Sequence, residues 1–134
     1  MERVLVIKED LKKKVTGADD VFKRVKKVKG IDWAQENFIV LFLDTRNIVL
    51  GSEVVFKGGL NECSIDPKTI FRKALVCNAN SIIIAHNHPS GYLEPSNEDW
   101  VVYERIKKAG ELISIKVLDS VIFNKTEYYS MERA

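Results

Sequence analysis

The sequence is poor in the residues and patterns that define several classes of protein. It has two cysteines in 134 residues, Cys63 and Cys77, and they do not have the spacing of a metal motif. A disulfide scaffold and a cysteine-based zinc site are therefore excluded, and we expect two reduced packing residues in a cytoplasmic protein. The apolar runs are far shorter than the roughly 20 residues that span a bilayer. The N-terminus has acidic residues and no small-residue cleavage site, so we expect no signal peptide.

What the sequence does contain is typical of one soluble globular domain over residues 1–134. Hydrophobic residues make up 46% and charged residues 30%, which is ordinary for a chain that can bury its own core. The net charge of +2 is uneven, because residues 1–30 carry 10 Lys or Arg against 5 Asp or Glu. This basic segment is a candidate for weak nucleic-acid contact. The alternative is a solvated, lysine-rich helix face, since no aromatic residues that would stack on bases interleave with the charges. No membrane contact and no oligomeric state are indicated.

Hydrophobic periodicity and turn residues divide the chain into strands and helices. Thr16 and Asp66 are expected to cap the first two helices, and Gly30 and Gly110 to end the first and the third. Helices alternate with strands except at one antiparallel hairpin, which predicts an α/β fold of three layers, α/β/α, around a mixed sheet. The expected strands cover residues 4–7, 38–43, 48–56 (broken by Gly51), 81–86, 113–118 and 120–124, and the expected helices begin near residues 16, 67 and 96.

Apolar residues at helical spacing predict which side of each helix faces the core. The uninterrupted apolar run at residues 38–43 predicts a central strand that is buried on both faces. The helical residues expected to face inward are Val21, Val25 and Val28 in the first helix, Ile70, Phe71, Ala74, Leu75 and Cys77 in the second, and Val102, Ile106 and Ala109 in the third.

Residues 85–100, AHNHPSGYLEPSNEDW, contain the residues best suited to chemistry. His86 and His88, the two histidines of the chain, stand where an apolar strand ends, and alternate residues of an extended segment point to the same side. A turn-rich loop follows, and the helix that begins at Ser96 can bring Asp99 back toward both rings. Two histidines and an aspartate suit zinc, and three protein ligands leave a fourth place for a water that becomes a nucleophile near neutral pH.

Such a water needs a base, and the sequence offers several carboxylates. Glu36 immediately precedes the central strand, whose beginning can lie beside the end of the strand at residues 81–86. Glu53 is the main rival, in the middle of the returning hairpin strand, and Glu94 and Glu98 are competitors in the loop and on the helix surface. Sequence physics favours Glu36 without excluding the others.

Each part of this pattern also has a simpler explanation. A lone His-x-His pair is more often packed or hydrogen-bonded than metal-bound, and Ser96 with Asp99 is also a helix N-cap with an acidic third residue. The triplet His86-Asn87-His88 spells the name of a nuclease class, but those nucleases disperse the named residues over a ββα unit. The combination of all these features in one short stretch favours the metal site.

The spacing of these residues resembles the JAMM (MPN-plus) metalloprotease family, and within it the RadC-like branch. The family pattern is a glutamate, then His-x-His-Pro, six residues, and Ser-x-x-Asp. Here it is met by Glu36, by residues 86–89 and by Ser96 with Asp99. The segments HNHPSG, PSNED, FLDTRN and DPKTIFRKAL carry the RadC-like character, and the resemblance covers roughly residues 15–130.

The resemblance implies a cytidine-deaminase-like α/β/α fold and a role for each residue of the motif. His86, His88 and Asp99 would bind Zn²⁺, and Glu36 would be the general base on the zinc-bound water. Ser96 would hydrogen-bond that water or the developing oxyanion. The implied reaction is hydrolysis of a peptide or isopeptide bond in a peptide or protein substrate.

The chain departs from the family pattern at positions that leave the motif intact. Asp119-Ser120 replaces the usual Asp-His, Gly91-Tyr92-Leu93 replaces Gly-Asp-Pro, and Lys68 replaces an arginine. These changes affect the expected substrate contacts and loop shape. The N-terminal helix-hairpin-helix region of longer RadC proteins is also expected to be absent. Two alternative functions stay open: a DNA-repair-associated accessory protein with a non-catalytic metal site, and an interaction module without turnover.

Overall fold

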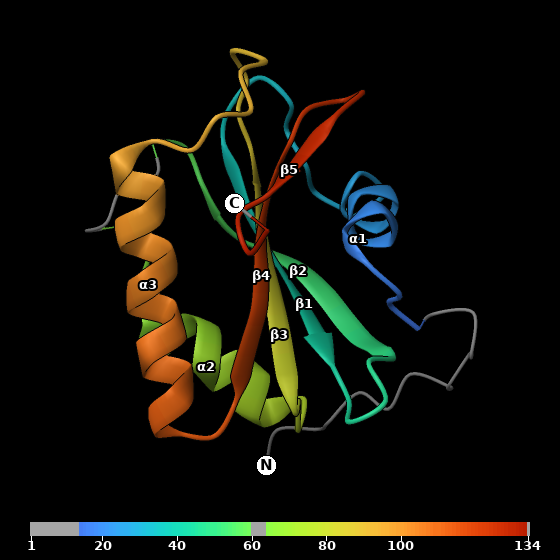
Figure 1. The fold of residues 1–134 in the computed structure, drawn as a ribbon, viewed down its shortest axis with the longest axis vertical. Coiled ribbons are helices and arrows are strands. Elements are labelled where there is room, and N and C mark those ends of the chain that lie inside the picture. The colour runs from blue at the N-terminus through green and yellow to red at the C-terminus, as the bar shows by residue number, and fades with distance from the viewer. Residues whose placement is uncertain (1–13, 60–63, 134) are drawn as a thin grey trace.

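The computed structural model describes residues 14–59 and 64–133, which form a five-stranded mixed sheet covered by helices on both faces (Figure 1). The strand expected at residues 4–7 and Cys63 lie outside these residues. The three-layer α/β/α prediction is confirmed. The elements are α1 (Ala18–Val25), β1 (Asn37–Leu43), β2 (Val49–Lys57), α2 (Pro67–Val76), β3 (Ser81–Asn87), α3 (Asn97–Leu112), β4 (Lys116–Phe123) and β5 (Tyr128–Ser130).

The order of the strands in the sheet is β2-β1-β3-β4-β5. β3 and β4 are parallel, and the other neighbours are antiparallel. Helices α2 and α3 cover one face and α1 covers the other (Figure 1). No helix in the described part of the chain has both the length and the apolar character that a membrane crossing requires.

The two central strands, β1 and β3, are buried along their whole length. Because side chains alternate across a strand, β1 supplies both layers of the core. Phe38, Val40 and Phe42 pack with α2 and α3, and Ile39, Leu41 and Leu43 pack with α1. This two-sided burial explains why both strands read as continuous apolar runs.

The first helix is shorter than its sequence pattern predicts. Gly17, rather than Thr16, occupies the N-cap position of α1, and no side chain caps the helix. Thr16 instead uses its backbone N–H to bond the Asp20 carboxylate at 3.3 Å. The helix ends at Val25, not at Gly30, and Val28 still packs against the core in the turn that follows.

Helix α2 begins as predicted, with the Asp66 side chain accepting a hydrogen bond from the backbone N–H of Lys68. Its predicted inner face is correct for Ile70, Phe71 and Ala74, which are buried. The prediction that Leu75 faces inward is wrong, because Leu75 is 62% exposed. Helical spacing placed it at the margin of the apolar stripe, and the sheet covers only the centre of that stripe.

Helix α3 has the predicted N-terminus and a different C-terminus. Ser96 is the N-cap, but Gly110 lies inside the helix, which continues to Leu112. A Cβ atom at Gly110 would lie 2.3 Å from the backbone oxygen of Ile115, so glycine is required for close approach rather than as a helix end. The left-handed residue after the helix is Ser114, with φ of 61°.

Two predicted breaks in strands are absent. Gly51 lies within β2, where the register against β1 skips Leu50 and produces a bulge. The strands expected at residues 113–118 and 120–124 are one strand, β4, with Asp119 at its centre. A polar residue looked like a break, but its side chain is hydrogen-bonded inside the fold.

Candidate metal centre

The site is built where β3 ends beside the beginning of β1. The two strands are antiparallel and Phe38 pairs with His86, so the chain before β1 and the chain after β3 meet at one edge of the sheet. The His86 ring is buried and lies parallel to the Phe38 ring, with 6.4 Å between the ring centroids. His88 continues the ladder by donating its backbone N–H to Phe123 at 3.3 Å. Backbone pairing therefore sets both histidines in place.

The loop after β3 holds the His88 ring in one orientation. The backbone N–H of Gly91 bonds the His88 carbonyl at 2.9 Å, and the turn uses a left-handed conformation that suits glycine, with φ of 89°. His88 Nδ1 lies 2.7 Å from the backbone oxygen of Tyr92. Because a carbonyl oxygen only accepts, Nδ1 carries the proton of this bond. In the neutral ring, Nε2 therefore presents its lone pair on the other side.

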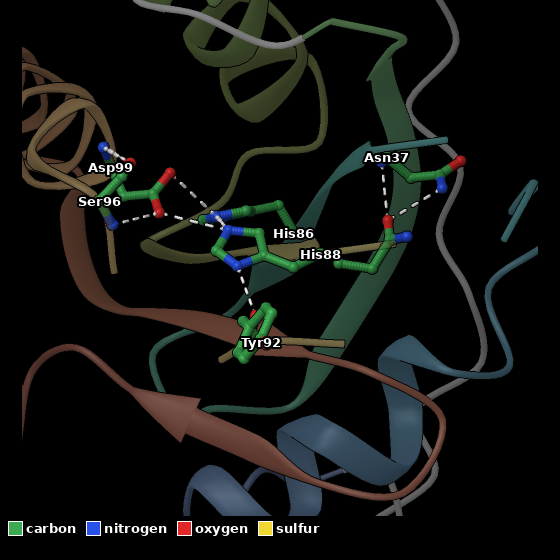
Figure 2. A network of polar contacts seen from close by, with 7 residues as sticks. Asn37, His86, His88, Tyr92, Ser96 and Asp99 are labelled. Carbon is green, nitrogen blue, oxygen red and sulfur yellow. Dashed lines mark hydrogen bonds and ion pairs between the residues drawn. The ribbon is translucent and has the colours of Figure 1, made fainter. Parts of the chain in front are cut away.

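Asp99 completes a group of three converging side chains (Figure 2). His86 Nε2 lies 3.2 Å from Asp99 Oδ1, and His88 Nε2 lies 3.3 Å from Asp99 Oδ2. The two Nε2 atoms are 3.1 Å apart. A tetrahedral metal with ligands at 2.0–2.1 Å separates its ligand atoms by about 3.3 Å, so the spacing of this group fits one small cation.

The Ser96 capping box orients the Asp99 carboxylate. Ser96 Oγ accepts the backbone N–H of Asp99 at 3.0 Å, and Asp99 Oδ2 accepts the backbone N–H of Ser96 at 2.9 Å. The helix-cap explanation of Ser96 and Asp99 is thus correct, and it coexists with the approach of Asp99 to the histidines. Ser96 itself is exposed, and its predicted contact with a reacting oxygen stays a prediction.

The pKa values of Asp99 and His88 are shifted in opposite directions. Burial by itself would raise the pKa of the Asp99 carboxyl, but hydrogen bonds from His86 and His88 outweigh it and hold that pKa well below its ordinary value. The hydrogen bond to Asp99 raises the pKa of the His88 imidazole, against the opposing effect of burial. An anion fixed beside two imidazoles is an environment that favours a bound cation.

Glu36 lies at the same place, just before β1. It is half-buried, and burial raises the pKa of its carboxyl, while the charges of His86 and His88 act in the opposite direction. Beside it is a cavity of about 20 Å³, which has room for roughly one water molecule. The cavity is lined by Glu36, Phe38, Ile65, His86, Glu98, Asp99, Val102 and Ser120.

The three other carboxylates considered as the base, Glu53, Glu94 and Glu98, lie in different places relative to the candidate site. Glu53 forms an ion pair with Lys73 at 2.7 Å and lines a different hollow, between β2 and α2. Glu94 is exposed in the loop. Glu98 lines the same cavity as Glu36, from the first turn of α3. The structure therefore brings Glu36 and Glu98 to the candidate site, and the choice of Glu36 as the base stays a prediction.

The departures from the family pattern have structural consequences near the site. Ser120 lines the cavity, whereas Asp119 turns away and accepts Ser130 Oγ at 2.6 Å. Tyr92 is 79% exposed, and its backbone carbonyl, not its ring, contacts His88. Lys68 is exposed in the first turn of α2. No described residue accepts a hydrogen bond from His86 Nδ1, which is buried.

Two asparagines were missed by sequence reasoning. Asn37 and Asn87 are 0% and 1% exposed and hydrogen-bond to each other between β1 and β3. Asn87 separates the two histidines, and Asn37 follows Glu36. A polar amide inside an otherwise apolar strand must find partners when it is buried, and this expectation would have drawn attention to both.

Comparison with known proteins agrees with the resemblance in the motif. The family model described as "RadC-like JAB domain" matches residues 15–134. A UPF0758 protein of Staphylococcus haemolyticus is 42% identical over 118 residues, which is 88% of this chain and 51% of the relative. A UPF0758 protein of Chlorobaculum tepidum is 41% identical over 130 residues, 97% of this chain and 58% of the relative. The chain thus spans about half the length of the curated relatives it matches.

Proposed function

The chain belongs to the RadC-like JAB domain family, and from that premise we propose that it is a metal-dependent hydrolase of peptide or isopeptide bonds. His86, His88 and Asp99 would hold Zn²⁺. The observation that carries the proposal is the convergence of their ligand atoms, 3.1 to 3.3 Å apart. The names of the relatives state no activity or substrate, so the reaction rests on the site and the family.

The donor set supports zinc over a harder cation. Imidazole nitrogen with one carboxylate suits Zn²⁺, whereas Mg²⁺ and Ca²⁺ prefer oxygen ligands. Three protein ligands are the number found in catalytic zinc sites. The hydrogen bond from His88 Nδ1 to the Tyr92 carbonyl leaves Nε2 as the atom that would bind the metal, as the hydrogen-bond partners of metal-bound histidines do. Zn²⁺ bound there would polarise the scissile carbonyl and lower the pKa of a water molecule.

The chain's own residues would move the proton and orient the reacting atoms. The Glu36 carboxyl, with its raised pKa, would accept the proton of the attacking water and deliver it to the leaving amine. Ser96 Oγ accepts the Asp99 backbone N–H, so its hydroxyl proton is available to a substrate oxygen. Phe38 packs along His86 and keeps the ring from turning.

Zinc binding with paired variants tests this proposal. Wild-type protein is expected to bind one Zn²⁺ per chain and to cleave peptide or isopeptide-linked reporters. Glu36→Gln should keep the metal and lose hydrolysis by about 10² to 10⁴-fold, the usual contribution of a general base. His88→Ala should lose the metal.

Glu53→Gln is the matched control, because Glu53 pairs with Lys73 outside the cavity, and it should keep both properties. Wild-type protein that binds no zinc at micromolar concentration would contradict the proposed site. Full zinc occupancy without cleavage would instead favour an accessory protein or an interaction module. The expected peptide or protein substrate is a prediction, as is weak nucleic-acid contact through the basic segment at residues 1–30.

A further inference from the structure

We propose that the Asn37–Asn87 pair positions the general base, by holding the backbone on both sides of Glu36 against the strand that carries the two histidines. This inference rests on the proposed role of Glu36. Neither asparagine contacts the metal ligands in this scheme. They act as positioning residues through the main chain.

The side chain of Asn87 bonds the backbone on each side of Glu36. Its Oδ1 accepts the backbone N–H of Asn37 at 2.7 Å, and its Nδ2 donates to the carbonyl of Gln35 at 3.0 Å. The carbonyl of Glu36 itself accepts the N–H of Gly58 at 3.0 Å. The peptide groups around Glu36 are therefore tied to β3 on one side and to the end of β2 on the other.

Asn37 closes the turn that precedes Glu36. Its Nδ2 donates to the carbonyl of Asp32 at 2.8 Å, to that of Gln35 at 2.9 Å and to Asn87 Oδ1 at 2.9 Å. Its Oδ1 accepts the N–H of Asp32 at 3.1 Å. Three acceptors share two N–H bonds, so this amide draws residues 32–35 and Asn87 together around one point.

The geometry of a strand explains why the pair acts on Glu36 and not on the metal. Asn87 lies between His86 and His88 in sequence, so its side chain points to the opposite face from both rings. Figure 2 shows Asn37 on the far side of His86 and His88 from Asp99. The residue between the two ligands thus fixes the segment that carries the base, and it does so across fifty residues of sequence.

Burial makes this arrangement specific. Both amides are almost completely removed from solvent, and a buried amide is stable only with its hydrogen bonds made. A shift of the Glu36 segment would break them together. Since a misplacement of about 1 Å can reduce a rate about 100-fold, a rigid link between base and ligands has a large effect on turnover.

Asn87→Ala tests the inference through three measurements on the full chain. Amide hydrogen exchange at Asn37 should accelerate about tenfold or more, because its N–H bonds the Asn87 side chain, and the change should be confined to residues 35–37. The Kd for Zn²⁺ should change less than about threefold, since the ligand backbone is held by the strand ladder. On a peptide that wild-type protein cleaves, kcat should fall about 100-fold with KM within about threefold.

Two further variants keep the test decisive. Asn87→Asp retains the acceptor for the Asn37 N–H, so it should preserve protection at that amide and recover part of kcat. It also serves if Asn87→Ala does not fold. Asn80→Ala, an exposed asparagine just before the other end of β3, is the matched control and should leave all three measurements unchanged.

Unchanged exchange at Asn37, or acceleration by one common factor along the whole chain, would overturn the inference, because the second pattern indicates a purely structural role. Loss of Asn37 protection in folded Asn87→Asp would also overturn it. The exchange and zinc measurements require no turnover. A chain that lacks hydrolysis therefore refutes the proposed function, while protection at Asn37 still decides whether the asparagine pair holds the Glu36 segment against β3.

Discussion

Two aspartates of this chain, the half-buried Asp99 and the buried Asp119, have opposite environments. Asp99 faces two imidazoles, and their hydrogen bonds, working against burial, lower the pKa of its carboxyl. Asp119, in the middle of β4, faces neutral donors: Ser130 Oγ at 2.6 Å and the backbone N–H groups of Ser120 and Glu132 at 2.7 and 3.0 Å. Burial raises the pKa of Asp119 despite these bonds.

The difference separates a candidate metal ligand, Asp99, from a carboxyl with a structural role, Asp119. The carboxylate of Asp99 is held ionised beside two imidazole nitrogens, which suits a cation. The carboxyl of Asp119 joins β4 to β5 and to the segment after β5, and its partners are neutral hydrogen-bond donors. Burial of Tyr103 and, after it, the charge of Asp119 raise the pKa of the Tyr103 phenol to about 12, so that phenol stays protonated. Burial alone does not identify a functional carboxylate, because the partners decide what it does.

The largest effect should come from removing the charge of Asp99. Asp99→Asn keeps an oxygen for the Ser96 N–H but removes the anionic ligand. Affinity for Zn²⁺ should fall by more than about 100-fold, since loss of a residue that only hydrogen-bonds to a metal ligand already costs about 10- to 100-fold. Calorimetric titration with Zn²⁺, or the visible absorption of bound Co²⁺, measures this. The same substitution at Asp119 should leave the affinity within about threefold; an equal loss at both positions would erase the contrast.

Substitution of Asp119 should instead change the stability of the fold. Asp119→Ala leaves the N–H groups of Ser120 and Glu132 without their acceptor, and should lower the free energy of unfolding by about 1–3 kcal/mol. Urea denaturation of the zinc-free protein checks this value. Ser130→Ala removes one donor of the same carboxyl and should cost less, about 1 kcal/mol. A loss of zinc binding in either folded variant would show that β4 supports the site more directly than we infer.

The smallest expected effect is a pH dependence in the zinc-free protein. Because the pKa of Asp99 is lowered from 3.8, its contribution to stability is present above about pH 4 and is lost as pH falls through the folded value. Because the pKa of His88 is raised from 6.5, its contribution is present below about pH 6.5 and is lost as pH rises through the folded value. The pair therefore stabilises the fold most between about pH 4 and 6.5.

The measurement is the difference in unfolding free energy between wild type and Asp99→Asn at several pH values. It should be largest near pH 5 to 6 and smaller at pH 8, because the contribution that comes from the raised pKa of His88 is lost as pH rises. Asp119 acts with the opposite sign, since its pKa is raised and its contribution is lost as pH rises. A flat difference between pH 5 and 8 would mean that Asp99 and His88 are not coupled.

The sequence predicted the layers and the grouping of the three candidate ligands because both depend on local pattern. Apolar runs with period two or 3.6 identify strands and helices, and the Ser96 cap is a signal over four residues. The wrong predictions concern residues whose role depends on a contact with another part of the chain. Gly110 looked like a helix end and is instead required by the backbone oxygen of Ile115. Asp119 looked like a break between strands and is instead paired with Ser130.

By itself, the sequence determined the α/β/α arrangement and the spacing that makes His86, His88 and Asp99 candidate ligands. Only the tertiary structure decided that β1 pairs antiparallel with β3, which brings Glu36 to the histidines and Asn37 to Asn87. The physical reason is that strand register and side-chain partners across fifty residues depend on how whole elements pack. Local periodicity carries no record of that packing.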